Sequence, residues 1–100
     1  MKRSHRMEKV NNELKRVLSE IFLTEIPVQQ DNIVTVLRVE ATSDLNEAKV
    51  YVSALKNGQD VVEQLNQKSG YIRHLVGNRI KIRKVPKFKF ILAEDLPILV

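Results

Sequence analysis

The positively charged side chains in the second half of the chain are the residues best suited to chemistry. Between residues 64 and 93 there are eight Lys or Arg residues and no Asp or Glu. Because each phosphate neutralised by Lys or Arg releases condensed counterions, such a segment predicts contact with a polyanion. Charge alone leaves one alternative open, a solvated basic face that has no partner.

A smaller basic cluster opens the chain, and an acidic stretch separates the two clusters. Residues 1–16 carry six Lys or Arg against two Glu, whereas residues 17–63 carry three Lys or Arg against eight acids. The whole chain has a net charge of +5. We expect the first cluster to extend the phosphate-binding surface that the second cluster provides.

Nine side chains are predicted to contact RNA, and they share a positive charge and a place in one of the two basic clusters. They are Arg73, Lys81, Arg83, Lys84, Lys87, Lys89, Lys68, Arg3 and Arg6. Arg73 and Arg83 should matter most individually, because a guanidinium group can hold one phosphate with two donors. Arg79 is not among them, since helical spacing turns it toward an apolar stripe.

Catalytic and metal-binding chemistry has little support in the sequence. The chain has no cysteine, which removes disulfides, thiolate metal sites and cysteine nucleophiles. Its two histidines, His5 and His74, have no carboxylate or nucleophile at a fixed spacing, and no phosphate loop, dinucleotide fingerprint or zinc spacing occurs. We therefore predict no catalytic residue, no metal and no cofactor, and we do not expect an enzyme.

Length and hydropathy indicate one domain over residues 1–100 that is soluble and cytoplasmic. One hundred residues with three Gly and three Pro leave no room for a linker between two folded halves. No apolar run approaches the roughly 20 residues that a membrane span needs. The basic start leads into an amphipathic pattern, not into the apolar segment of a signal peptide.

Hydrophobic periodicity predicts the elements that position the basic side chains. Apolar residues at steps of three and four favour a helix over residues 5–25, and Pro27 bars its continuation. Residues 32–41 are rich in β-branched side chains, and residues 48–55 alternate, so together they predict an antiparallel hairpin. A helical stripe then resumes, and residues 85–92 predict a third strand that begins near a proline.

Gly70 interrupts this second helical stripe without changing its phase. A glycine in a helix interior costs roughly 0.5–1 kcal/mol relative to alanine, which suggests that it is kept for a close backbone approach or a bend. We predict a kink at Ser69 and Gly70 between helices over 59–68 and 71–79. A merely tolerated glycine is the alternative. The expected fold is α+β, in the order α-β-β-α-kink-α-β, with the helices on one face of a three-stranded sheet.

This order and several stretches of sequence resemble the ribosome-binding factor A family, which has a type II KH-like fold. The resemblance covers roughly residues 3–92. The stretches are RMEKVNNELKRVLSEI, VTVLRVEATSDLNEAKVYVSAL, SGYIRHLVGNRIKIRKVP and PKFKF. Lys68 stands where the family pattern has the alanine of Ala-x-Gly. Members often continue into a C-terminal tail, so the residues after 93 correspond to a short or truncated tail.

The resemblance implies an RNA-binding assembly factor. Members of the family bind the immature small (30S) ribosomal subunit through 16S rRNA, assist its late maturation and rRNA processing, and support growth in the cold. It also implies release linked to a ribosome-associated GTPase, and we expect a monomer that has no membrane partner. Two alternatives stay open, a generic KH-like RNA-binding module and a basic protein-interaction domain, neither of them tied to ribosome assembly.

The resemblance also raises the question of how RNA is recognised. KH domains clamp four nucleotides with a Gly-x-x-Gly loop. This chain has no such tetrapeptide, because Gly70 and Gly77 stand seven residues apart. We therefore predict recognition by shape and phosphate more than by a reading of four bases.

Overall fold

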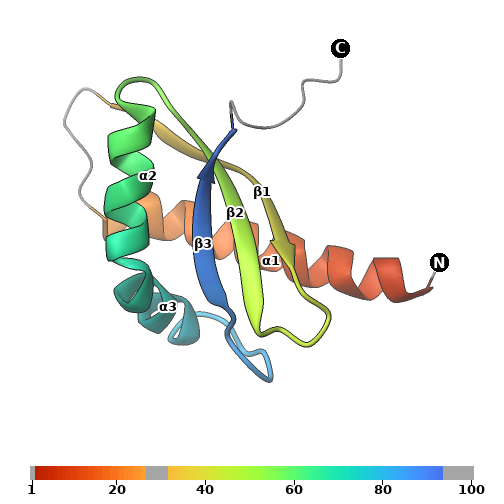
Figure 1. Ribbon diagram of the computed structural model, residues 1–100. Coiled ribbons are helices and arrows are strands. Elements are labelled where there is room, and N and C mark those ends of the chain that lie inside the picture. Colours follow the sequence, from red (N-terminus) through yellow and green to blue (C-terminus); the bar gives the residue numbers. More distant parts are fainter. Residues whose placement is uncertain (1, 27–31, 94–100) are drawn as a thin grey trace, which may run out of the picture.

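The computed structural model describes the backbone of residues 2–26 and 32–93, and side chains from residue 6 onward within these ranges. Its helices and strands follow the expected order along the chain (Figure 1). They are α1 (Lys2–Thr24), β1 (Val34–Ala41), β2 (Glu47–Ala54), α2 (Gly58–Gln67), α3 (Ser69–Gly77) and β3 (Lys87–Leu92). The α+β order predicted from the sequence is therefore confirmed, with bounds that differ by one to three residues.

The three strands form one sheet in the order β1-β2-β3. β1 and β2 are the antiparallel hairpin that was expected, with a register shift between Val36 and Arg38. β2 and β3 are parallel, with Val50 opposite Phe90. α1 crosses behind the sheet, and α2 and α3 lie beside β3 (Figure 1). The helices thus cover one face of the sheet, as the sequence predicted.

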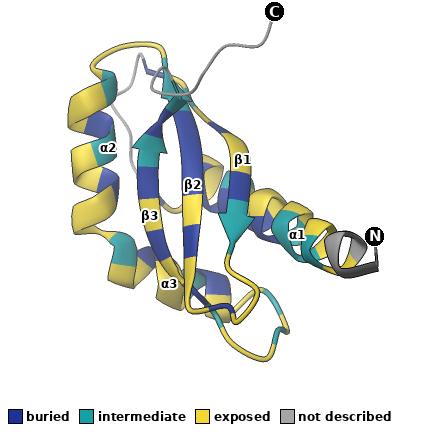
Figure 2. Ribbon diagram, turned by 45° about the vertical axis from the view of Figure 1, so that its right-hand side comes forward, coloured by how far each residue is buried: buried dark blue, intermediate teal, exposed yellow. Residues whose placement is uncertain are grey.

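The core lies between α1, α3 and the covered face of the sheet. The apolar stripe of α1 is fully buried at Leu14, Val17, Leu18 and Ile21. Along β3 and the first half of β2, buried residues alternate with more exposed ones (Figure 2), and Tyr51 of β2 breaks the alternation because it is buried too. Each fully buried Leu, Ile or Val side chain contributes about 1.5–3 kcal/mol relative to exposure, so this interface supplies most of the driving force for folding.

The break between α2 and α3 lies at Lys68, one residue before the predicted kink. Lys68 has φ −97° and ψ 10°, while Ser69 and Gly70 are the first two residues of α3. The Ile72 N–H still donates to the Lys68 carbonyl oxygen at 2.9 Å, which keeps the apolar stripe in phase. The predicted position of the kink is therefore wrong by one residue.

No neighbouring segment of backbone approaches Gly70 closely. A Cβ atom added at this position would meet no atom within 4 Å, and the backbone has no positive φ at any glycine of the described residues. The proposed contact role of Gly70 is therefore wrong. The empty space around Gly70 agrees with the alternative, in which the helix merely tolerates a glycine at this position.

Asn66 of α2 covers the outer edge of β3. Its side-chain amide donates to the Phe90 carbonyl at 3.1 Å, and its Oδ1 accepts from the Phe90 N–H at 2.8 Å. This pair replaces the hydrogen bonds that a fourth strand would make, so the edge does not present these groups unpaired. Within the described residues, no helix is long and apolar enough to cross a membrane.

Candidate nucleic-acid interface

The segment 78–86, between α3 and β3, presents three of the predicted side chains. Lys81, Arg83 and Lys84 are exposed, while Ile80, Ile82 and Val85 pack against the core. The alternation of apolar and basic residues in IKIRKV thus has a physical meaning. The isoleucines anchor the segment, and their neighbours are turned toward solvent.

Contacts from α3 and from the β1–β2 turn fix this segment in place. Arg73 Nε donates to the Val85 carbonyl oxygen at 3.0 Å. Lys84 Nζ donates to the side-chain oxygen of Asn46, whose carbonyl accepts from the Lys87 N–H at 3.0 Å. Two predicted phosphate ligands, Arg73 and Lys84, therefore also position the loop that carries the others.

A groove runs between the first half of α1, the β1–β2 turn and segment 78–86. It has a volume of about 480 Å³. Its lining residues are Arg6, Met7, Val10, Ser43, Leu45, Ile82 and Arg83. A second hollow shares Val10 and Ile82 with it and adds Lys9 and Lys81. We call the cations Arg6, Lys9, Lys81 and Arg83 the groove cations. The structure thus brings Arg6, Lys81 and Arg83 together, as the predicted surface requires.

Lys87 and Lys89 belong to a different surface. They alternate along β3 with buried Phe88 and Phe90, so they stand on the face of the sheet opposite α1. Lys89 lies beside Lys49 of β2 in the parallel register. The alternation of the predicted strand over residues 85–92 already separates these lysines from the phenylalanines, because a strand sends successive side chains to opposite faces. Their contact with RNA stays a prediction.

Sequence reasoning missed Lys49 as a member of this second surface. The alternation over residues 48–55 places Lys49 on the open face with Tyr51, and that signal was available. We call Arg38, Lys49, Lys87 and Lys89 the sheet-face cations. Arg38 forms an ion pair with Glu40, which also accepts a hydrogen bond from the Tyr51 hydroxyl at 3.3 Å. Burial and the nearby Glu40 raise the pKa of Tyr51, so it is neutral at physiological pH.

The remaining predicted residues lie away from both surfaces or beyond description. Lys68 is exposed at the junction of α2 and α3. The Arg3 side chain lies outside the described residues. Arg79, which was left out of the predicted RNA contacts, lines the second hollow. Its ion pair with Glu25 at 3.0 Å partly neutralises its charge. Its absence from the RNA contacts stays a prediction.

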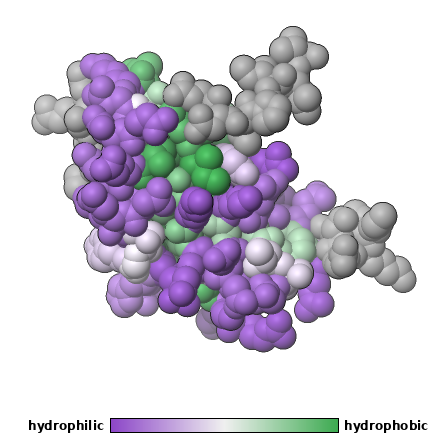
Figure 3. All heavy atoms as spheres, viewed as in Figure 1, coloured by the Kyte–Doolittle hydropathy of each residue, from purple (hydrophilic) through white to green (hydrophobic). Residues whose placement is uncertain are grey.

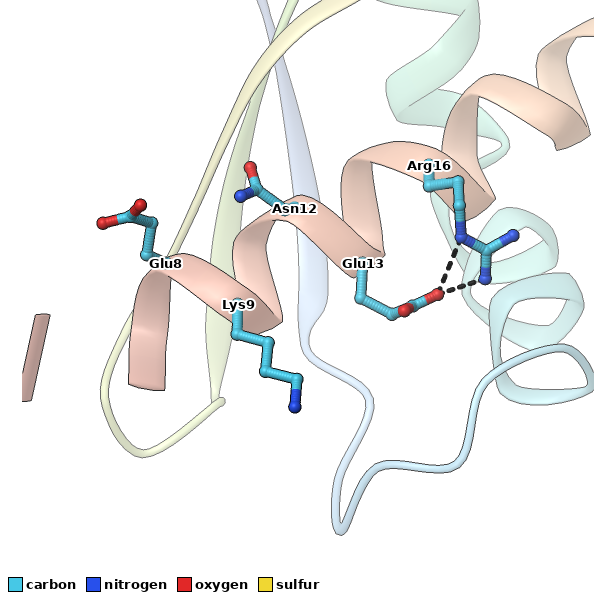
Figure 4. Close-up of a pocket in the computed structure, with 5 residues that line it drawn as sticks. All are labelled: Glu8, Lys9, Asn12, Glu13 and Arg16. Atoms are coloured by element: carbon cyan, nitrogen blue, oxygen red, sulfur yellow. Dashed lines mark hydrogen bonds and ion pairs between the residues drawn. The ribbon is translucent and has the colours of Figure 1, made fainter. Parts of the chain in front are cut away.

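Arg16 on α1 illustrates a cation whose charge is balanced internally. Its guanidinium group contacts Glu13 through two nitrogens (Figure 4). It also donates to Glu20 at 2.8 Å. The hydrogen bond and charge of Glu13, followed by those of Glu20, raise the pKa of Arg16. The hollow beside it, which also includes Glu8 and Asn12, is therefore a poorer phosphate site than the groove.

The β1–β2 turn holds one wall of the groove rigid. Asp44 accepts hydrogen bonds from the Thr42 hydroxyl at 2.7 Å and the Asn46 N–H at 3.0 Å. These two bonds, in that order, lower the pKa of Asp44. Leu45 follows with φ 59°, a left-handed conformation that costs a non-glycine residue roughly 1–2 kcal/mol. The turn thus fixes Leu45 in an unfavourable backbone conformation.

The fold and the groove define a small basic α+β protein with a candidate phosphate-binding surface at one end. A sequence model of the ribosome-binding factor A family matches residues 6–96. Ribosome-binding factor A of Natranaerobius thermophilus is 37% identical over 94 residues, which are 91% of this chain and 72% of that protein. The chain therefore belongs to the ribosome-binding factor A family.

Solved structures show the same fold. The crystal structure of ribosome-binding factor A from Thermus thermophilus superposes with a TM-score of 0.79 at 20% identity, covering 91% of this chain and 99% of that one. A homology model of the Thermus thermophilus factor, fitted into a cryo-EM map of its complex with the 30S subunit, has a TM-score of 0.71 at 24% identity. It covers 87% of this chain and 94% of that one.

Proposed function

We propose that this protein binds the immature small ribosomal subunit through 16S rRNA and assists its late maturation and rRNA processing. One observation carries the proposal, the convergence of the groove cations from α1 and segment 78–86. None of the four has a hydrogen-bond or ion-pair partner among the described residues. Cations gathered at a groove without internal anions are suited to bind a phosphate backbone.

Two carboxylates lie near one of the groove cations, since Glu8 and Glu13 line a neighbouring hollow together with Lys9. Glu13 lines the second hollow with Lys9 and Lys81, but its Oε1 is held by Arg16. The positive charge of the groove is therefore available to a partner. The Thermus thermophilus relative that was fitted into a 30S complex supports the small subunit as this partner.

The remaining parts of the proposal follow from membership of the family. The protein acts in the cytoplasm as a monomer, by binding and without catalysis of its own, and a ribosome-associated GTPase is linked to its release. A role in growth in the cold belongs to the same proposal. The chain is proposed to work as one KH-like RNA-binding domain, with phosphate contacts from the groove and additional contacts from Lys68 and the sheet-face cations.

Co-sedimentation with purified ribosomal subunits tests the proposal. The wild-type protein should be retained on immature small subunits more than on large subunits, and the retention should fall steeply as salt rises. Lys15→Gln is a matched control on α1, because Lys15 is exposed and lines neither the groove nor the second hollow, and it should bind nearly as the wild type does. Equal retention on both subunits would favour a generic RNA-binding module.

The alternative function is a binding site for an acidic or apolar protein. Co-sedimentation at several salt concentrations also tests this alternative. Binding through phosphates loses affinity linearly in a plot of log K against log salt concentration, whereas an apolar protein interface changes little. Retention on the small subunit that does not respond to salt would therefore contradict an rRNA contact through the groove cations.

A further inference from the structure

We propose that the groove holds one unpaired nucleotide of the bound RNA, with its base on the apolar floor and its phosphate between Arg6 and Arg83. The inference rests on the proposed function and specifies the chemical form of the RNA at this site. It adds one base contact to the recognition by shape and phosphate that the absence of a Gly-x-x-Gly loop predicts.

The composition of the groove fits a nucleotide better than a bare phosphate. Its floor is apolar, from Met7, Val10, Leu45 and Ile82, and Arg6 and Arg83 carry the charge. No carboxylate is among the lining residues that the structure describes. The volume of about 480 Å³ lies within the roughly 300–1,000 Å³ that is usual for small-ligand sites.

The chemistry of an unpaired nucleotide matches both parts of this lining. Its phosphate is an anion that Arg binds with two donors, and its base has an apolar face. Unpaired bases in RNA are commonly splayed out and stacked on guanidinium planes or apolar side chains. A duplex keeps its bases stacked inside, so it would leave the floor of the groove without a partner.

The backbone of Leu45 provides a second, independent observation. This leucine has φ 59°, although a glycine or asparagine would adopt that conformation at lower cost. Its side chain is 8% exposed and lines the groove, yet it lies outside the contiguous hydrophobic core. Strained residues held by their surroundings are often part of a functional site. Here the strained residue contributes an apolar side chain to the same groove lining as Arg6 and Arg83.

The hydrogen bonds of the β1–β2 turn hold this floor before any ligand binds. The Leu45 N–H donates to the Thr42 carbonyl at 2.9 Å, and Asp44 accepts from both Thr42 and Asn46. Lys84 and the Lys87 N–H join the same turn to segment 78–86 through Asn46. The β1–β2 turn and segment 78–86 are thus fixed relative to one another, which lowers the entropy cost of ordering these residues when a ligand binds.

Two oligonucleotides with equal charge test the inference. One is a single-stranded hexauridylate, and the other is an abasic ribose-phosphate chain of the same length and phosphate number. Fluorescence anisotropy at one fixed salt concentration should show hexauridylate binding about fivefold more tightly, the lower end expected for one base contact. Equal affinity for the two chains would overturn the inference.

Variants of the floor separate the base contact from the phosphate contacts. Ile82→Ser should abolish the preference for hexauridylate, so that this variant binds hexauridylate and the abasic chain equally. Met7→Ser on α1 is a second variant with the same expected result, in case Ile82→Ser does not fold. Ile33→Ser is the matched control, because Ile33 lies before β1, at the end of that strand away from the turn. A preference that survives both floor variants would also overturn the inference.

Co-sedimentation of the same proteins distinguishes the two proposals. Wild-type protein that binds small subunits but does not distinguish the two oligonucleotides overturns the nucleotide site and leaves the proposed function intact. Wild-type protein that fails to bind small subunits overturns the proposed function itself. A preference for hexauridylate that Ile82→Ser removes, together with binding to small subunits, supports both.

Discussion

The groove and the open face of the sheet carry equal numbers of cations but differ in what surrounds them. Arg6 and Arg83 line a groove that has no carboxylate among its described lining residues, and Glu13, which lines the second hollow with Lys9 and Lys81, is engaged by Arg16. On the sheet face, Arg38 is paired with Glu40, and Lys87 lies opposite Glu47 in the register. Equal charge therefore does not produce equal sites, because neighbouring carboxylates compete with a phosphate.

The two regions also differ in how the chain builds them. The sheet face needs only the pairing of β1, β2 and β3. Figure 3 shows hydrophobic side chains near the centre of this view, with hydrophilic ones around and below them. The groove needs α1, the β1–β2 turn and segment 78–86 to meet. This comparison indicates that the site assembled from distant segments is the more specific of the two.

The largest expected effect comes from reversing charge in each region separately. Arg6→Glu with Arg83→Glu should weaken binding to small subunits about a hundredfold, since a hydrogen bond to a charged group is worth roughly 1.5–3 kcal/mol. Lys87→Glu with Lys89→Glu should weaken it by about tenfold or less. Co-sedimentation titrations measure both, with circular dichroism to verify folding. A larger loss from the lysine pair would reverse the ranking of the two regions.

Removing the side chain that covers β3 should affect stability more than binding. Asn66→Ala leaves the Phe90 N–H and carbonyl without their partner, so the free energy of unfolding should fall by about 2 kcal/mol. Urea denaturation measures this change, and Gln64→Ala on α2 is the matched control. An unchanged midpoint would mean that water replaces Asn66 at this edge at no cost.

A smaller and opposite change is expected at Gly70. An added Cβ meets no atom within 4 Å, so Gly70→Ala should raise the free energy of unfolding by about 0.5 kcal/mol through helix propensity and reduced chain entropy. Thermal unfolding measures the change. A loss of stability would restore a contact role for this glycine. Increased stability with weaker binding would instead indicate that the glycine is kept for function.

The smallest effect is a local dependence on acid in the β1–β2 turn. Because the folded-state pKa of Asp44 is lowered from 3.8, its stabilising contribution is fully present above that value and is lost as pH falls through the folded pKa. Hydrogen exchange of the Leu45 and Asn46 amides should therefore show less protection, relative to the rest of the sheet, below about pH 3.8 than at pH 5. Asp44→Asn should remove most of this difference. Protection that does not change with pH would contradict a stabilising role for the ionised carboxylate.

The sequence alone determined the elements and their order. The stripe of α1, the alternation of β2 and β3 and the turn residues between them are local patterns, and local patterns follow directly from helix and strand geometry. The basic clusters along the chain also identified Arg6, Lys81 and Arg83 as candidate phosphate-binding residues. The alternation over residues 48–55 also indicates that Lys49 lies on the open face of the sheet. Counting charges along the chain did not identify Lys49.

Only the tertiary structure decided which cations share a surface. Charge along the chain placed Lys84, Lys87 and Arg83 together, but the start of β3 at Lys87 sends Lys87 and Lys89 to the open face of the sheet. Packing also assigned Arg73 to a carbonyl and Arg79 to Glu25, contacts between residues 12 and 54 positions apart. Side-chain partners at such separations depend on how the elements pack. Local periodicity therefore predicts the fold of this protein, whereas packing creates its groove.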